Sequence, residues 1–164
     1  MAGLKKRYGQ QRGAAALETV LLTPAALLLL YTIAQYCLIF VATQIFTYTA
    51  EEALRRSISF VDSNCYYGGE CSTLDLEDEI ERNGDLVIRI IAGDSPTLFG
   101  KSLSNIELFD IEASTYETPS SEDDVCCKVT VTYQYSQAPF LPSKIFGVEL
   151  PVPDTLTGTA MLTM

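Results

Sequence analysis

The chain has 164 residues, 48% of them hydrophobic and 20% charged, which suggests one domain plus an anchor, since domains usually have about 100–150 residues. Its formal net charge of −10 disfavours nucleic acid as a partner, because binding to phosphates needs a basic face. The sequence contains no histidine, so it lacks the commonest general base and the commonest metal ligand.

The first twelve positions are basic although the chain as a whole is acidic. They hold four of the eleven basic residues and no carboxylate: Lys5, Lys6, Arg7 and Arg12. Lysine and arginine next to a membrane segment stay on the cytoplasmic side. The basic terminus therefore predicts an orientation in which the rest of the chain lies on the other side of the membrane.

A long uncharged segment follows. The 32 positions between Glu18 and Glu51 contain no charged residue, and a helix of about 20 apolar residues crosses a bilayer. Pro24 is expected to bend this helix or loosen one turn, because it has no amide proton. The threonine hydroxyls are expected to bond to carbonyls of the same helix, at Thr19, Thr23 and Thr32.

The alternative for this segment is a cleavable secretory signal followed by a soluble protein. Thr32-Ile33-Ala34 offers only a weak small-residue cleavage site, and the apolar character continues beyond it through Phe46. A discarded signal would not need that continuation, so the sequence favours a retained membrane helix.

Glu18 lies at the edge of the apolar segment. A carboxylate there is costly, since an acidic residue at mid-bilayer costs roughly 2.5–3.5 kcal/mol, and less near an interface. Cleavage after Gly13 would create an amine on Ala14, four residues before Glu18, and such an amine could neutralise the Glu18 of a neighbouring subunit. The alternative is a helix-start glutamate that is favoured by the helix dipole.

These residues carry a family resemblance. The basic leader, Gly13, the small residues after it and Glu18 resemble the type IV prepilin signature that prepilin peptidases recognise. The longer stretch 12–18, with Pro24 and the leucines 27–30, is similar to the TadE-like minor pilins. Residues 50–56, Ala-Glu-Glu-Ala-Leu-Arg-Arg, are similar to the end of the long helix in that family. The resemblance covers about residues 12–60, and Thr19 departs from it where the family often has an aromatic residue.

The resemblance implies a minor pilin, or pseudopilin, that takes part in assembling a Tad-type (Flp) adhesive pilus. It implies a leader (1–13) cleaved by prepilin peptidase after Gly13, a transmembrane and projecting helix (14–60), and a periplasmic head (61–164). Glu18 and Pro24 would serve assembly. The implied partners are prepilin peptidase, other pilin subunits, the inner-membrane assembly platform and membrane lipid, and the implied location is the inner membrane or a surface filament.

The second half of the long helix is expected to leave the membrane. A helix from Ala14 to Phe60 would be roughly 70 Å long, more than twice the thickness of the hydrocarbon core. Ion pairs are expected at the i, i+4 spacing between Glu51 and Arg55 and between Glu52 and Arg56. A sheet is expected to pack on an apolar stripe formed by Ile45, Phe46, Ala50, Ala53, Leu54 and Ile58.

The rest of the chain predicts a small α+β head with an antiparallel sheet. Residues 73–82 predict a short acidic helix that Thr73 caps and Asn83-Gly84 ends. Strands are predicted at 86–91, 106–113 and 155–163, and the clearest period-two alternation spans 128–135. Four prolines restrict 136–153 to loop or edge geometry.

The five cysteines divide between two environments. Cys37 lies in the apolar segment, where a thiol behaves as a small hydrophobe. The other four belong to the part expected in an oxidising space, and we favour disulfides that join the 65–71 loop to the 126–127 strand: Cys65, Cys71, Cys126 and Cys127. A zinc site is disfavoured, because these cysteines lack the usual paired short spacing.

Three further segments resemble phosphate- or calcium-binding motifs but do not match them. Gly100-Lys101-Ser102 lacks the earlier glycine of a phosphate-binding loop. Residues 79–84 imitate the opening of a calcium loop, but the twelfth position is Ile90 instead of glutamate. The acidic run 122–124 favours a solvated turn over a calcium site. No serine is marked out as a nucleophile, so we expect no catalytic residue, no metal and no cofactor, and the chain is not expected to be an enzyme.

Two alternatives to the pilin hypothesis remain open. One is a single-span, membrane-anchored periplasmic binding protein whose leader is not processed. The other is a pseudopilin of a secretion system, which the sequence separates poorly from a pilus subunit.

Overall fold

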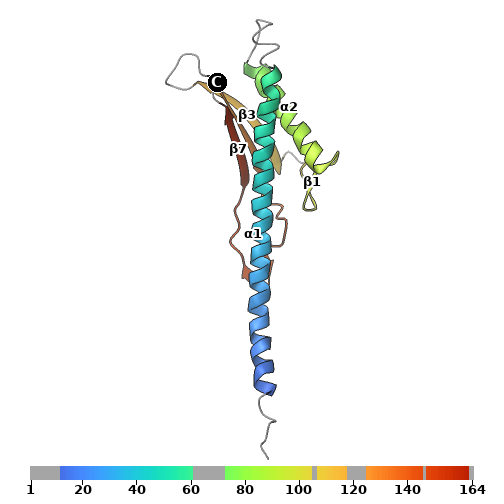
Figure 1. Ribbon diagram of the computed structural model, residues 1–164, viewed down its shortest axis with the longest axis vertical. Helices are drawn as coiled ribbons and strands as arrows, with labels where there is room; N and C mark the ends of the chain where they lie inside the picture. Colours follow the sequence, from blue (N-terminus) through green and yellow to red (C-terminus); the bar gives the residue numbers. More distant parts are fainter. Residues whose placement is uncertain (1–11, 61–72, 105–106, 118–124, 146, 163–164) are drawn as a thin grey trace, which may run out of the picture.

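The computed structural model describes residues 12–60, 73–104, 107–117, 125–145 and 147–162. A long helix, α1 (Arg12–Phe60), forms the axis of the molecule, and the other described elements lie beside its middle and C-terminal parts (Figure 1). This arrangement of one long N-terminal helix followed by small antiparallel sheets confirms the predicted α+β class.

Helix α1 contains 49 residues and continues through Pro24 without interruption. The three threonine hydroxyls donate to carbonyls of the preceding turn, as predicted: Thr19 to Ala16 at 2.9 Å, Thr23 to Thr19 at 2.6 Å and Thr32 to Leu28 at 2.8 Å. These bonds satisfy polar groups that would otherwise meet an apolar environment.

The main sheet has three antiparallel strands in the order β3 (Phe109–Glu117), β4 (Val125–Tyr133) and β7 (Leu156–Leu162). The predicted alternation on the central strand is confirmed, because Val129, Val131 and Tyr133 are completely buried. The strand expected over 155–163 is also confirmed, and the strand expected over 106–113 is observed from Phe109 onward; Ile106 lies outside the described residues.

One face of this sheet packs against α1. Phe46 lies at the centre of the contact, with its ring 5.7 Å from that of Phe109 and 6.0 Å from that of Tyr133. Strand β7 approaches α1 so closely that a Cβ on Gly158 would lie 2.3 Å from the amide nitrogen of Thr47. The predicted apolar stripe on α1 forms this contact: Phe46, Ala50, Ala53 and Leu54 are buried and Ile45 is half-buried, while the side chain of Ile58 is not described.

The structure contradicts the prediction for residues 73–91. A single helix, α2 (Thr73–Ala92), continues through Asn83 and Gly84, and the strand predicted over 86–91 is helical. Gly84 does not end the helix, because it lies in the contact with α1 and β3: a Cβ there would be 3.1 Å from Ile111 and 3.7 Å from Ala53. The buried residues of α2 follow helical spacing: Leu76, Ile80, Val87 and Ile88.

Asn83, the other residue that was expected to end the helix, also contacts a neighbouring element. Asn83 donates its side-chain amide to Ser57 on α1 at 3.1 Å and to Glu79 at 3.3 Å. Helix α2 ends instead at Ala92, directly after the apolar run 86–91, where Gly93 has a φ of 85° and donates its amide to the Arg89 carbonyl at 2.8 Å. This left-handed glycine closes the helix in the usual way.

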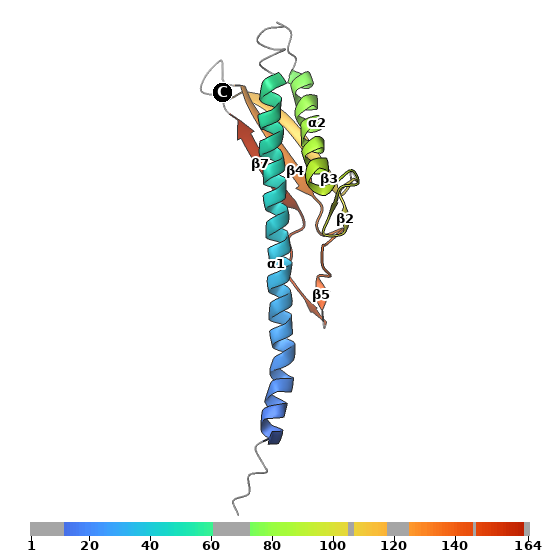
Figure 2. The same cartoon turned by 45° about the vertical axis from the view of Figure 1, so that its right-hand side comes forward.

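Two short hairpins complete the described fold. The first joins β1 (Thr97–Leu98) to β2 (Lys101–Ser102), and its two turn residues, Phe99 and Gly100, have φ of 49° and 80°. The second joins β5 (Lys144–Ile145) to β6 (Val148–Glu149) within the proline-rich segment, which agrees with the predicted loop or edge geometry. This second hairpin is the lowest part of the head beside α1 (Figure 2).

Of the two ion pairs predicted on α1, one is confirmed. Arg56 donates to Glu52 at 3.0 Å. Arg55 turns toward Glu52 as well, at 3.9 Å, and does not pair with Glu51 as predicted. Glu52 is thus near two arginines, of which Arg55 is largely exposed and Arg56 less so.

Candidate functional site

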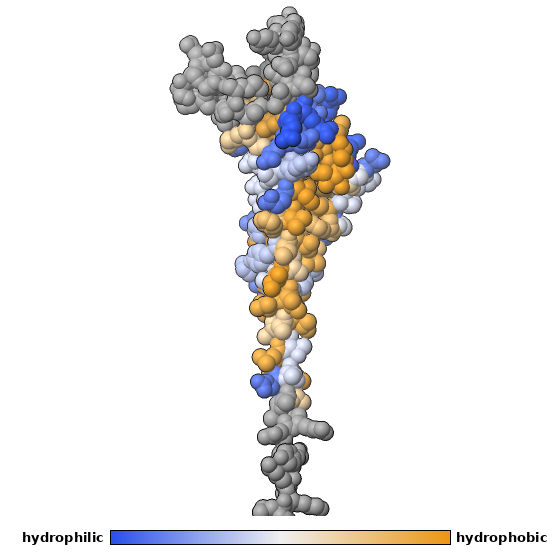
Figure 3. Space-filling view, in the orientation of Figure 1, coloured by the Kyte–Doolittle hydropathy of each residue, from blue (hydrophilic) through white to orange (hydrophobic). Residues whose placement is uncertain are grey.

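The N-terminal part of α1 extends beyond the head and is bare. Most of its large apolar side chains are more than half exposed to solvent: Leu17, Val20, Leu21, Leu22, Leu27, Leu29 and Leu30. In the space-filling view this stretch forms an apolar column below the head (Figure 3). A contiguous exposed apolar surface of this size indicates contact with lipid or with another apolar surface.

Glu18 lies within this column and is exposed. It stands next to Leu17 in the chain and one turn before Leu21 and Leu22, so its carboxylate is surrounded by apolar side chains on the helix surface. An ionised group among side chains that suit a membrane needs a partner when lipid surrounds it.

Pro24 lies one to two turns above Glu18. A shallow hollow beside it is lined by Val20, Thr23, Pro24 and Leu27, almost entirely by apolar atoms. The proline leaves the carbonyl of Val20 without its usual amide donor. At Pro24 the exposed column therefore has a shallow hollow and a turn that lacks one backbone hydrogen bond.

The predicted cleavage site lies at the start of α1. The described helix begins at Arg12 and includes Gly13 and Ala14, but the side chains of these residues and the preceding residues 1–11 are not described. Cleavage after Gly13 therefore stays a prediction.

Above the bare column, the head closes over α1 at a polar residue. Gln35 is completely buried and donates its side-chain amide to the Tyr135 hydroxyl at 2.8 Å, while its amide oxygen has no partner. Burial raises the pKa of Tyr135 above its ordinary value. This contact places a polar side chain of the uncharged segment inside protein instead of lipid.

Two tyrosines of α1 flank this contact and bond to the proline-rich segment. Tyr31 donates to the carbonyl of Pro142 and Tyr36 to the carbonyl of Pro151, each at 2.6 Å. No sequence pattern marks Tyr31, Gln35 or Tyr36 as a residue that contacts the head. These residues could have been noticed because they are phenols and an amide in an otherwise apolar segment. Their hydrogen-bond partners, however, are brought to them only by the fold.

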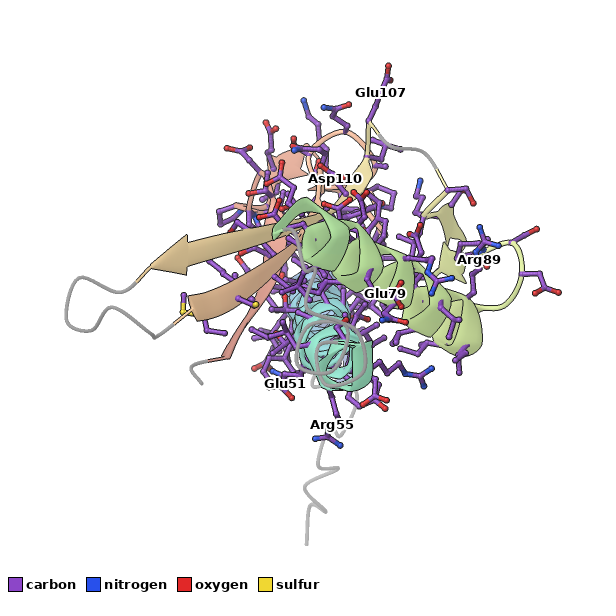
Figure 4. All side chains as sticks on the ribbon, turned by 90° about the horizontal axis from the view of Figure 1, so that it is seen from above. Glu51, Arg55, Glu79, Arg89, Glu107 and Asp110 are labelled. Atoms are coloured by element: carbon purple, nitrogen blue, oxygen red, sulfur yellow. The ribbon has the colours of Figure 1, made fainter. Side chains whose placement is uncertain are left out.

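The side of α1 that faces away from the head stays exposed far above the column. Ile33, Phe40, Val41 and Tyr48 are between 44% and 65% exposed. Seen from above, Glu51 and Arg55 lie on the side of α1 that faces away from the sheet (Figure 4). Above the bare column, an exposed apolar stripe therefore continues on this side of α1 from Ile33 to Tyr48 and ends at charged residues.

The cysteine prediction is largely outside the described structure. Cys127 is buried on β4, whereas Cys65 and Cys71 lie outside the described residues and the side chain of Cys126 is not described. Disulfides between the 65–71 loop and the 126–127 strand stay a prediction. Cys37 is exposed on α1, within the apolar stripe.

One hollow of the head lies between α2 and the start of β3, with a volume of about 340 Å³. Its charged lining is mainly acidic: Glu81, Asp85, Asp94 and Asp110, with Arg89. Across the described residues, no group of three or more cysteines and carboxylates is placed to hold a metal ion. Residues 79–84, which imitate a calcium loop in sequence, lie inside α2, and the run 122–124 lies outside the described residues.

By length and composition, α1 is suited to cross a membrane, over a stretch within Ala16–Ser57. Residues 13–55 match the family model described as TadE-like protein, which confirms the resemblance found over about residues 12–60. The match covers the bare column, Glu18, Pro24 and most of the helix that the head packs on. No curated protein and no solved structure matches the chain.

Proposed function

We propose that this TadE-like chain is a minor pilin, a subunit of the pseudopilin type that takes part in assembling a Tad-type adhesive pilus. The observation that carries the proposal is the bare apolar column of α1, which extends beyond the head and contains the exposed Glu18. A helix needed only as the core of a soluble domain would be covered by that domain along its whole length.

The proposed processing follows from the N-terminal residues. Prepilin peptidase cuts after Gly13 on the cytoplasmic side, where the basic leader is retained. The cut removes residues 1–13 and leaves an α-amine on Ala14. The subunit then rests in the inner membrane by one span, with its head in the periplasm, before it enters a surface filament.

The proposed assembly step pairs the carboxylate of Glu18 with the Ala14 amine of a neighbouring subunit. Both charges are costly in lipid, and each lowers the cost of the other when they meet. The bare column and the exposed stripe from Ile33 to Tyr48 supply the apolar surface for packing against other pilin subunits. The small residues Ala14, Ala15 and Ala16 allow helices to approach closely there.

Other partners follow from this cycle. The inner-membrane assembly platform moves the subunit from lipid into the filament, and membrane lipid covers the column until then. No nucleic acid is expected as a partner, because the chain carries a net charge of −10.

The first experiment determines the mature N-terminus by intact mass and N-terminal sequencing, after expression with and without a prepilin peptidase. We expect a start at Ala14 only when the peptidase is present. An uncut Met1 in both samples would contradict the proposal and favour a membrane-anchored periplasmic binding protein without leader processing.

The second experiment replaces the carboxylate. Glu18→Leu is expected to be processed and inserted normally, but its incorporation into filaments should fall about tenfold or more, since roughly 2.5–3.5 kcal/mol is at stake for a charge in lipid. The matched control is Glu51→Leu, which changes an exposed carboxylate on the same helix outside the column. Normal incorporation of Glu18→Leu, or an equal loss in both variants, would overturn the pairing. If incorporation occurs only into a secretion-system pseudopilus, the chain belongs to that system instead.

A further inference from the structure

The lowest part of the head is held against α1 at a fixed height. The Tyr31 hydroxyl donates to Pro142, just before β5, and the Tyr36 hydroxyl donates to Pro151, just after β6. The hairpin itself is closed by its β5–β6 pairing and by a bond from the Leu150 amide to the Ser143 carbonyl at 2.9 Å. The hairpin therefore cannot change its height along the helix without breaking these bonds.

The helix below these bonds has the length of a membrane span. From Arg12 to Tyr31 it rises roughly 28 Å at 1.5 Å per residue, and the hydrocarbon core of a bilayer is about 30 Å thick. When this stretch spans the membrane, Tyr31 lies at the boundary between hydrocarbon and headgroups. The bond to Pro142 then brings the hairpin to the same boundary.

The hairpin surface has the chemistry of that boundary. Val148 is 45% exposed on β6, and Ile145 on β5 is half-buried. Lys144 lies opposite Glu149 in the strand register, so the two charges offset each other. Tyr31 and Tyr36 present phenols, which are enriched at membrane interfaces.

We infer that the β5–β6 hairpin rests in the headgroup layer of the bilayer, with Val148 as its contacting side chain. The partner is a lipid surface, and because the hairpin charges offset each other, its contact does not depend on anionic lipid. The head is thus seated on the membrane, without a helical stalk between the two. This inference rests on the membrane span in the proposed function, but it needs neither leader cleavage nor a filament.

The test uses single tryptophans, because the chain has none of its own. The full chain with Val148→Trp is reconstituted into phosphatidylcholine vesicles whose acyl chains are brominated near the headgroup, and quenching of the tryptophan emission is measured. Leu86→Trp on α2 is the matched control, because Leu86 is 44% exposed and Val148 45%. Leu21→Trp lies near the middle of the proposed span, so it is measured in vesicles brominated near the ends of the acyl chains, where it reports on the span itself.

We expect quenching of Val148→Trp to be at least about twofold stronger than that of Leu86→Trp. Lys144→Trp, on the other strand of the hairpin, should give the same result and guards against a local defect in one variant.

If Leu21→Trp is quenched but both hairpin variants match Leu86→Trp, the inference is overturned while the span survives. If Leu21→Trp is not quenched, both the span and this inference fail. Shielding of Val148→Trp that depends on protein density and not on bromination would assign the hairpin to a second copy, and it would also overturn the inference.

Discussion

The two halves of α1 have similar residues and different surroundings. In the lower half, Leu21 is 76% and Leu29 is 59% exposed, whereas in the upper half Ala42, Phe46 and Ala50 are completely buried. Both halves are apolar and helical in sequence. Hydrophobicity alone therefore does not show whether an apolar helix surface is left exposed, to lipid or a neighbouring subunit, or is covered by the protein's own sheet.

The change from one half to the other takes place between Tyr31 and Gln35. Tyr31 bonds to Pro142 at the lower edge of the head, and at Gln35 the side chain is buried and bonds to Tyr135 inside the head. A polar side chain at this position would be costly in lipid and is tolerated inside the head because its amide finds a partner. Gln35 therefore marks the upper limit of the segment that lipid can surround.

The sharpest test of the comparison is a pair of matched truncations. Phe46→Ala should destabilise the head by about 3–5 kcal/mol, because it removes a buried ring from the contact with Phe109 and Tyr133. Leu29→Ala, on the same helix, should change head stability by less than about 0.5 kcal/mol. Urea unfolding of the full chain in detergent, followed by tyrosine fluorescence, measures both. If both variants lost the same free energy of unfolding, the lower half of α1 would contribute to the stability of the head as well, which would contradict the comparison.

A smaller effect is expected where β7 touches α1. Gly158→Ala should destabilise the head by about 1–3 kcal/mol, since its Cβ would meet the backbone of Phe46 and Thr47, which cannot move cheaply. The control is Gly84→Ala, whose Cβ would meet the flexible side chain of Ile111 and which gains helix propensity. Its net effect should stay within about 1 kcal/mol. Thermal unfolding of the two variants beside the wild type checks the ranking, and the reverse order would contradict the observed close contact.

The smallest effect concerns alkaline pH. Burial, and then the neighbouring Tyr135, raise the pKa of Tyr133. Its unfolded pKa is about 10, so above that pH the unfolded state loses the proton before the folded state does. Stability is therefore unaffected by this group at lower pH and falls as the pH rises from about 10 toward the folded pKa.

Tyr133→Phe isolates this contribution. The variant should start about 1 kcal/mol less stable, because it loses the bond from the Tyr133 hydroxyl to the Ala138 carbonyl, which is 2.7 Å long. It should then lose less stability than the wild type as the pH rises. Denaturation midpoints measured across the alkaline range provide the comparison, and parallel curves for the two proteins would refute the assigned pKa direction.

Much of the architecture was accessible from local patterns. The uncharged stretch, the alternation on β4 and the strand near the C-terminus each depend on residues close together in the chain, and each is confirmed. The failure at α2 has the opposite cause. Asn83 and Gly84 are ordinary helix-ending residues when only their neighbours are considered, yet they remain helical because α1 and β3 pack against them.

The sequence by itself determined the long apolar helix, the position of Glu18 and Pro24 on it, and the TadE-like character of residues 13–55, because these depend on composition and on spacing along one helix. Only the tertiary structure decided where the bare column ends and which side of α1 stays open. Tyr31, Gln35 and Tyr36 find partners more than 90 positions away in the chain, since each partner is brought to α1 by the folding of the head. Contacts over such separations leave no local pattern, and the height of the head above the column follows from them.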